Sequence, residues 1–201
     1  MSANDSYKKW IVLDIDGTLS MTIDPEEYHD LDNNTKKYFN KITYHPFENK
    51  DFTKDAWVMS RPYLKVFLDY CFEHYRVGVW SIGQPGYVNA IVKHLFEGYE
   101  PEFVYNFTNC HRESNPVRFL KRLSDSPAMD GLIIEDSIEV IDIKDKHVII
   151  QRFDMYLPDS TDLSDPFDSD EVDDIMDFDI LLYDDCLLKI IDILNKMDRK
   201  N

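Results

Sequence analysis

The chain has 201 residues, of which 43% are hydrophobic, and its formal net charge at neutral pH is −17. This length supports one sizeable hydrophobic core with a small insertion, so we expect a single domain over residues 1–201. The chain has 39 acidic and only 22 basic residues. This balance argues against direct binding to nucleic acid, which requires Lys and Arg to neutralise phosphates.

The first predicted element is a strand at residues 9–15, KWIVLDI. Its short apolar run with β-branched residues is typical of a buried parallel strand. The strand ends in two carboxylates separated by one residue, Asp14 and Asp16, directly before a Gly-Thr turn.

Residues 20–60 are first polar and then aromatic, and they end in the strand-like AWVM. We expect an insertion here that carries a small β-hairpin.

Helices and strands alternate along the rest of the chain. Apolar residues recur at helical spacing over residues 61–75 and 86–98, and a last amphipathic helix is predicted at about 184–198. Apolar segments typical of strands lie between and after the first two helices, at residues 76–82, 102–107, 131–136 and 147–152. This alternation predicts an α/β fold, a Rossmann-like and mostly parallel sheet that is flanked by helices on both faces.

Residues 154–185 form an acidic segment between the last predicted strand and the last helix. The segment contains thirteen Asp or Glu and no Lys, Arg or His. This composition is typical of a solvated connector, and the alternative is an acidic docking arm.

Polar side chains follow three of the predicted strands. Asp14 and Asp16 end the first strand, Ser81 ends the second, and Glu135 and Asp136 end the fourth. Ligands of an open parallel sheet bind beyond the carboxyl ends of its strands, so we expect these groups to lie together. Four carboxylates at one edge repel each other unless a cation joins them, and Mg²⁺ prefers such oxygen ligands. The sequence therefore predicts a magnesium site at this edge.

The two aspartates of the first strand are suited to phosphoryl transfer. With a metal in place, the Asp14 carboxylate can attack phosphorus and form an aspartyl-phosphate intermediate. Asp16 is then placed to protonate the leaving oxygen and later to activate water. The alternative, in which both aspartates only cap the turn after the strand, does not account for the polar groups at the other strand ends.

Five sequence motifs together resemble a known family. DIDGTL at residues 14–19 resembles the first motif of the haloacid dehalogenase (HAD) superfamily, whose members mostly transfer phosphoryl groups. The later motifs AWVMSRPYLKVFL, VWSIG, HRES…FLKRLS and LIIEDS follow in the order seen in the NLI-interacting-factor-like family. That family includes phosphatases of the RNA polymerase II C-terminal domain. The resemblance covers about residues 9–152 and the last helix, and it implies a HAD-like fold with Mg²⁺ as cofactor.

The resemblance also implies roles for single residues. Asp14 corresponds to the nucleophile and a Mg²⁺ ligand, Asp16 to a general acid/base whose backbone carbonyl also binds the metal, and Asp136 to the remaining metal ligand. The groups implied in substrate and phosphate binding are Thr18, Ser81, Arg112 and Lys121.

Two positions depart from the family pattern. Arg122 stands where the family usually has Asp, and Glu135 stands where it often has the first residue of Asp-Asn. Glu135 is longer than Asp by one methylene, which alters the surroundings of the metal. Neither change removes a reacting group.

The predicted function is Mg²⁺-dependent hydrolysis of phosphoserine or phosphothreonine in a phosphoprotein or phosphopeptide. RNA polymerase II C-terminal repeats are suggested as the substrate by the resemblance alone. An insertion of about 40 residues is short for the large cap that encloses small metabolites, so an open site is expected. The alternatives are a phosphatase of small phosphorylated metabolites and a non-catalytic protein-binding module. Intact Asp14 and Asp16 argue against the binding module, and the sequence does not indicate the oligomeric state.

The insertion is rich in aromatic residues, for which two explanations remain open. They form either a satellite core or a surface that holds an apolar side chain of the substrate peptide, as the resemblance implies. These residues are Tyr38, Phe39, Tyr44, Phe47, Phe52 and Trp57.

The cysteines and the hydropathy indicate the compartment. Cys71, Cys110 and Cys186 are scattered, and they match neither a disulfide framework nor a zinc site. No segment approaches the roughly 18 apolar residues that cross a bilayer, and the N-terminus lacks an apolar signal core. We therefore expect a soluble intracellular protein, in the nucleus or the cytoplasm, without a membrane partner.

Overall fold

The core of the fold is a parallel β-sheet of five strands. The computed structural model describes residues 8–46, 52–114, 116–155 and 181–199. The strand order is β10-β9-β1-β5-β6, and every pair of neighbours is parallel. The strands are β1 (Trp10–Leu13), β5 (Arg76–Trp80), β6 (Phe103–Tyr105), β9 (Leu132–Glu135) and β10 (His147–Ile149). They match the five predicted strands and confirm the α/β class.

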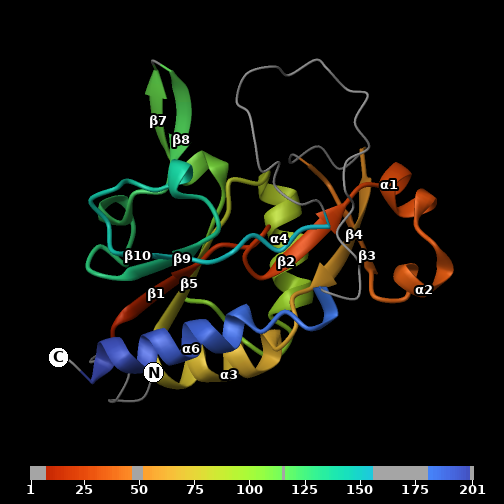
Figure 1. Cartoon of the computed structure of the whole chain (residues 1–201). Helices are drawn as coiled ribbons and strands as arrows, with labels where there is room; N and C mark the ends of the chain where they lie inside the picture. The colour runs from red at the N-terminus through yellow and green to blue at the C-terminus, as the bar shows by residue number, and fades with distance from the viewer. Residues whose placement is uncertain (1–7, 47–51, 115, 156–180, 200–201) are drawn as a thin grey trace, which may run out of the picture.

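Three α-helices cover one face of this sheet. They are α3 (Leu64–His74), α4 (Pro85–Leu95) and α6 (Cys186–Asp198), and α3 and α6 lie side by side (Figure 1). Ile11 and Leu13 of β1 belong to the same buried cluster as apolar residues of all three helices. Val12 points to the opposite face, because successive side chains of a strand alternate, and it packs near Trp80 in a second cluster.

The expectation of helices on both faces differs from the structure, and the strand order explains why. Crossovers between parallel strands are right-handed, so crossovers that advance in one direction lie on one face of the sheet. The chain advances from β1 to β5 to β6 through α3 and α4. It returns to β9 and β10 across the other face, where the described residues form a hairpin and 3₁₀ turns and no α-helix. Leu123, Ala128 and Ile141 of these connections cover that face.

The predicted insertion at residues 20–60 carries a second, antiparallel sheet. Its strands are β2 (Ser20–Ile23), β3 (Asn40–Tyr44) and β4 (Lys54–Ser60), in the order β2-β4-β3. Two short helices, α1 (Pro25–Asp30) and α2 (Asn33–Lys36), lie at its outer side (Figure 1). The expected hairpin is thus β3–β4, and β2 adds a third strand because Ser20 pairs with Ser60. A separate hairpin, β7 (His111–Ser114) and β8 (Val117–Leu120), lies in the connection between β6 and β9 and projects from the rest of the molecule (Figure 1).

Some aromatic residues of the insertion form a satellite core, and others lie outside it. Phe39 is buried in a cluster with Met21 and Met59, against which Trp57 packs, as in a satellite core. Trp57 also stacks on Tyr28, with the ring centroids 4.5 Å apart. Tyr44 instead faces Tyr87 of α4 at 5.4 Å between centroids, and Phe47 lies outside the described residues.

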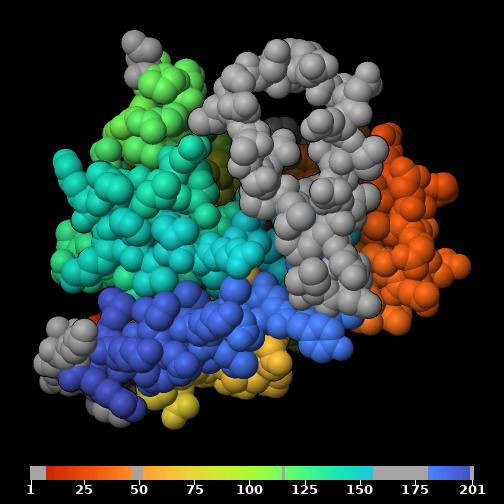
Figure 2. Space-filling view, viewed as in Figure 1, coloured from red at the N-terminus to blue at the C-terminus, as the bar shows by residue number. Residues whose placement is uncertain are grey.

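Most of the predicted acidic connector, residues 156–180, lies outside the described residues. Beyond it, Leu181 is buried, and Asp184 accepts hydrogen bonds from the Arg61 guanidinium at 3.1 and 2.8 Å. Helix α6 follows from Cys186 and lies along the segment that ends at residue 155 (Figure 2). Among the described helices, none has the length and apolar character needed to cross a membrane.

Candidate active site

A cavity of about 250 Å³ lies at the carboxyl ends of β1, β5 and β9. This is the edge of a parallel sheet at which ligands bind. Acidic, basic and hydroxyl groups line the cavity together, and they include Asp14, Asp16, Ser81, Lys121, Glu135, Asp136 and Arg152. The groups predicted to meet at the strand ends are thus brought together in one place.

Asp14 lines the cavity, one residue beyond β1. Its backbone N–H donates to the carbonyl of Ile134 at 3.1 Å, which extends the pairing of β1 with β9. The carboxylate is buried, with Oδ1 at 2.5 Å from Lys121 Nζ and with Oδ2 without a hydrogen-bond partner among the described residues. Burial raises the pKa of Asp14, and the charge of Lys121 opposes that rise.

Lys121 joins two buried carboxylates. It is 1% exposed, and its Nζ lies 2.5 Å from Asp14 Oδ1 and 2.5 Å from Glu135 Oε2. Burial favours the neutral amine, but the two carboxylates outweigh it and raise the pKa of Lys121, so the ammonium stays charged. Burial, followed by the charge of Asp14, raises the pKa of Glu135 to about 9. In the absence of a metal, Glu135 therefore keeps its proton at neutral pH.

This raised pKa predicts a pH-dependent stability. Between the unfolded value near 4.5 and the folded value of about 9, the folded protein holds a proton that the unfolded chain has lost. The free energy of unfolding should therefore fall as the pH rises, by at most about 1.4 kcal/mol per pH unit. Glu135→Gln should flatten the curve above about pH 6, which urea unfolding in the presence of a chelator measures. An equal slope in that variant would assign the proton to another group.

Asp16 lies at the side of the cavity and is oriented by helix α4. The hydroxyl of Tyr87 donates to Asp16 Oδ1 and also lies 2.8 Å from Thr22 Oγ1. Burial raises the pKa of Asp16 to about 6, with a smaller contribution from the charge of Asp14, whereas the Tyr87 hydrogen bond opposes the rise. Asp16 can therefore exchange a proton near neutral pH, as a general acid/base must.

Three carboxylates form a group that fits a divalent cation. One oxygen each of Asp14, Glu135 and Asp136 lies within 4.8 Å of the others, and Asp14 Oδ2 is buried without a hydrogen-bond partner. Oxygen donors of this kind suit Mg²⁺. The carboxylate of Asp16 is outside this group. Glu135 belongs to the group although it was not predicted as a ligand.

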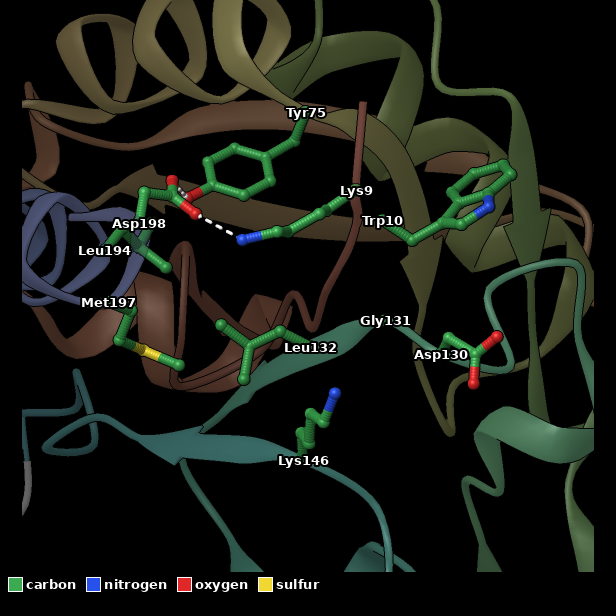
Figure 3. A pocket seen from close by; sticks show the side chains of 10 residues that line it. All are labelled: Lys9, Trp10, Tyr75, Asp130, Gly131, Leu132, Lys146, Leu194, Met197 and Asp198. Carbon is green, nitrogen blue, oxygen red and sulfur yellow. Dashed lines mark hydrogen bonds and ion pairs between the residues drawn. The ribbon is translucent and has the colours of Figure 1, made fainter. Parts of the chain in front are cut away.

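A second, smaller hollow of about 100 Å³ lies at the opposite end of the sheet, where β1 and β9 begin (Figure 3). Lys9 Nζ donates to the Asp198 carboxylate at 2.9 Å, and the Tyr75 hydroxyl donates to its other oxygen at 2.5 Å (Figure 3). These polar groups satisfy one another, and Leu132, Leu194 and Met197 supply much of the remaining lining. The cavity around Asp14 is therefore the candidate active site.

Sequence comparison identifies the family of the chain. The profile of the NLI interacting factor-like phosphatases matches residues 9–201. The chain belongs to this family. The CTD phosphatase-like protein 355R of Invertebrate iridescent virus 3 is 23% identical over 186 residues, which are 88% of this chain and 94% of that protein. The protein of the same name from Invertebrate iridescent virus 6 is 31% identical over 94 residues, 46% of this chain and 48% of that protein.

Solved structures share the fold. Fission yeast Fcp1, an RNA polymerase II CTD phosphatase whose variant was solved with beryllium fluoride, matches with a TM-score of 0.58 and 18% identity, over 76% of this chain and 43% of that chain. A second structure of Fcp1 matches with a TM-score of 0.59 and 17% identity, over 77% of this chain and 44% of that one. This chain thus spans less than half of the solved chains, and at these identities the likeness shows the HAD-like fold alone.

The other residues that the family resemblance implied lie in different places. Ser81 is buried at the cavity, and its Oγ accepts from the Gly83 N–H at 2.9 Å, which leaves its O–H for another acceptor. The Thr18 side chain is buried and does not line the cavity. Arg112 is exposed on β7 and does not line it either. Arg122 pairs with Asp142 at 2.9 Å, outside the cavity.

Three residues of this NLI interacting factor-like chain contribute to the site without having been predicted. Tyr87 is in the predicted helix but off its apolar stripe, and Arg152 is the last residue of the last predicted strand. Arg61 lies in the motif AWVMSRPYLKVFL. It is buried and donates to the carbonyls of Gly17 at 3.3 Å and Thr18 at 3.0 Å. A buried arginine that satisfies loop carbonyls fixes the loop after Asp14, a role that no local pattern indicates.

Proposed function

We propose that this protein is a Mg²⁺-dependent phosphatase that hydrolyses phosphoserine or phosphothreonine in proteins through an aspartyl-phosphate intermediate. The observation that carries the proposal is the state of Asp14, a buried carboxylate at the cavity with one oxygen held by Lys121 and the other without a hydrogen-bond partner among the described residues. Such an oxygen is oriented and poorly solvated, as a carboxylate nucleophile requires.

In the first half of the proposed reaction, Asp14 Oδ2 forms a bond to phosphorus while the bond between phosphorus and the serine or threonine oxygen breaks. Asp16, whose pKa is raised to about 6, donates a proton to that oxygen. The Lys121 ammonium offsets negative charge at the phosphoryl group, and the free O–H of Ser81 can donate to one of its oxygens.

In the second half, Asp16 acts as the base. Its carboxylate takes a proton from a water molecule, the water oxygen bonds to phosphorus, and the bond between phosphorus and Asp14 breaks. Inorganic phosphate leaves and Asp14 is restored. The Tyr87 hydroxyl holds Asp16 in one orientation through both halves, because it donates to the same oxygen, Oδ1.

Asp14, Asp136 and the backbone carbonyl of Asp16 are the proposed ligands of Mg²⁺, and Glu135 lies within reach of the same position. When bound, the ion would neutralise charge on the phosphoryl oxygens and on the crowded carboxylates. Lys121 already holds Asp14 and Glu135 in place from the side that faces the core.

A groove beside the cavity supports a peptide as the substrate. It encloses about 620 Å³ and is lined by both the insertion and α4, through Thr22, Ile23, Tyr44, Lys54 and Tyr87. Tyr87 belongs to the groove and also contacts Asp16, so a chain that fills the groove would pass directly beside the acid/base. RNA polymerase II C-terminal repeats are a candidate substrate, in view of the names of the similar proteins.

Hydrolysis of p-nitrophenyl phosphate with and without Mg²⁺ tests the proposal. We expect turnover that requires the metal, and higher kcat/KM for phosphoserine peptides than for free phosphoserine because the groove adds binding energy near the reacting group. No turnover with either substrate would favour a non-catalytic binding module, and preference for free phosphorylated metabolites would contradict the assignment of a protein substrate.

The role of Asp16 predicts a dependence on the leaving group. Asp16→Asn should lower the rate of phosphoserine cleavage by about 10²–10⁴-fold, because a serine alkoxide leaves only with a proton. Nitrophenolate leaves without one, so stopped-flow mixing with p-nitrophenyl phosphate should still release a burst of about one equivalent before the unactivated water step slows turnover. Equal loss of the burst and of phosphoserine cleavage would contradict the acid role.

A further inference from the structure

The cations around the cavity are unequally available to a ligand. Among the described residues that line the cavity, Lys121 and Arg152 are the two that carry a positive charge, against four carboxylates. A phosphate group that enters brings up to two further negative charges, so it needs a cation that can reach it. Lys121 is 1% exposed and already contacts Asp14 and Glu135, which leaves Arg152 as the cation at the open side of the cavity.

The Arg152 guanidinium lies at the cavity, and within the described residues some of its N–H groups have no acceptor. Its Nη1 donates to Asp136 Oδ2 at 2.8 Å, and its Nε donates to Asp154 at 3.1 Å. Within the described residues these bonds leave Nη2 without a hydrogen-bond partner, and the side chain is 59% exposed. A guanidinium presents several N–H groups in one plane and matches the oxygens of a phosphate.

The backbone that carries Arg152 is attached to the loop after β1 on both sides. Phe153, which is buried, donates its N–H to the Gly17 carbonyl at 2.7 Å. Gln151 accepts from Arg61 Nη2 at 2.8 Å, and Arg61 also donates to Gly17. Arg152 is therefore held at a defined place relative to Asp14 and Asp16, although its side chain extends into solvent.

Glycine at position 17 makes this approach possible. Its φ is +82°, and a Cβ built there would overlap Asp136 Oδ2 and lie 3.2 Å from Arg152 Cγ. A larger residue would thus separate the ion pair of Asp136 and Arg152 from the loop.

We infer that Arg152 is a phosphate-binding residue of this site, one that pairs with Asp136 in the free protein and donates to the phosphoryl oxygens of the substrate when Asp136 turns to a cation. This inference rests on the proposed function and adds to it a residue that binds the substrate. It differs from the assignment of Arg112, which is exposed on β7 and does not line the cavity.

The inference predicts that one variant weakens the binding of phosphate without weakening the binding of Mg²⁺. Arg152→Gln should weaken binding of inorganic phosphate in the presence of Mg²⁺ by about tenfold or more, because a charged hydrogen-bond donor is lost. Binding of Mg²⁺ alone should be unchanged or tighter, because the guanidinium no longer competes for Asp136. Isothermal titration calorimetry measures both, and the KM for p-nitrophenyl phosphate should rise with little change in kcat.

Two further variants control the experiment. Arg118→Gln removes an exposed arginine of β8 that pairs with Glu113, and it should change phosphate binding by less than about twofold. Arg152→Lys keeps the charge but not the planar fork, so its affinity should lie between those of the wild type and Arg152→Gln.

The outcomes separate this inference from the proposed function. If the wild type hydrolyses p-nitrophenyl phosphate and Arg152→Gln binds phosphate normally, the inference is overturned and the proposed function stands. If Arg152→Gln weakens phosphate and Mg²⁺ alike, Arg152 only positions Asp136 and the inference is again overturned. If the wild type neither binds phosphate nor turns over, the proposed function and the inference fail together.

Discussion

An Asp14→Asn variant is expected to lose at least about 10³-fold in kcat, because the amide that replaces the carboxylate cannot form the bond to phosphorus. Lys121 keeps Glu135 as a partner in this variant, so no buried charge is left alone. The free energy of unfolding should therefore change by less than the 3–5 kcal/mol, roughly, that breaking an isolated buried ion pair costs. Steady-state kinetics with p-nitrophenyl phosphate and urea unfolding measure the two effects.

A matched control makes the same chemical change elsewhere. Asp69→Asn on α3 alters an exposed carboxylate that pairs with Lys65, and both activity and stability should remain near the wild-type values. Full activity of Asp14→Asn would refute the aspartyl-phosphate intermediate. Loss of activity together with loss of folding would show that Asp14 is needed for the fold, and the proposed chemistry would then need a separate test.

Replacement of Lys121 by methionine is the second change with a large expected effect. Without the ammonium, the buried charge of the Asp14 carboxylate is left without a cation beside it, and the free energy of unfolding should fall by about 3–5 kcal/mol at pH 8. The loss should be smaller at pH 5, because burial raises the pKa of Asp14 in the folded protein and protonation there removes the unpaired charge. Activity should fall by about 10²–10³-fold, since one group that offsets phosphoryl charge is gone.

A double variant tests the origin of this destabilisation. In Lys121→Met combined with Asp14→Asn, the buried charge that is left without a cation is removed, so the double variant should be more stable than the sum of the single effects indicates. Lys93→Met, at an exposed position of α4, is the control for the loss of a lysine. Additive effects, or a loss that does not depend on pH, would mean that packing of the lysine stem and not its charge stabilises the site.

Local patterns in the sequence were sufficient to predict the strands of the parallel sheet, the helices that pack on it and part of the candidate site. A buried strand needs a short apolar run and a packed helix needs an apolar stripe, and both requirements act over a few neighbouring residues. Because all strands of this sheet are parallel, the residues after β1, β5 and β9 must meet at one edge, so Asp14, Ser81 and Asp136 could be placed there without a structure.

The tertiary structure alone decided which other side chains complete the site. The contact between Lys121 and Asp14 joins residues 107 positions apart and depends on the whole return path across the sheet. The contact of Tyr87 with Asp16 depends on how α4 packs beside the loop after β1, and that of Arg152 with Asp136 on the pairing of β9 with β10. Among the described helices, α3 and α4 lie on one face because of the strand order, which periodicity does not encode. Periodicity reports only whether a residue faces a core, whereas contacts between distant segments depend on how the elements between them are connected and packed.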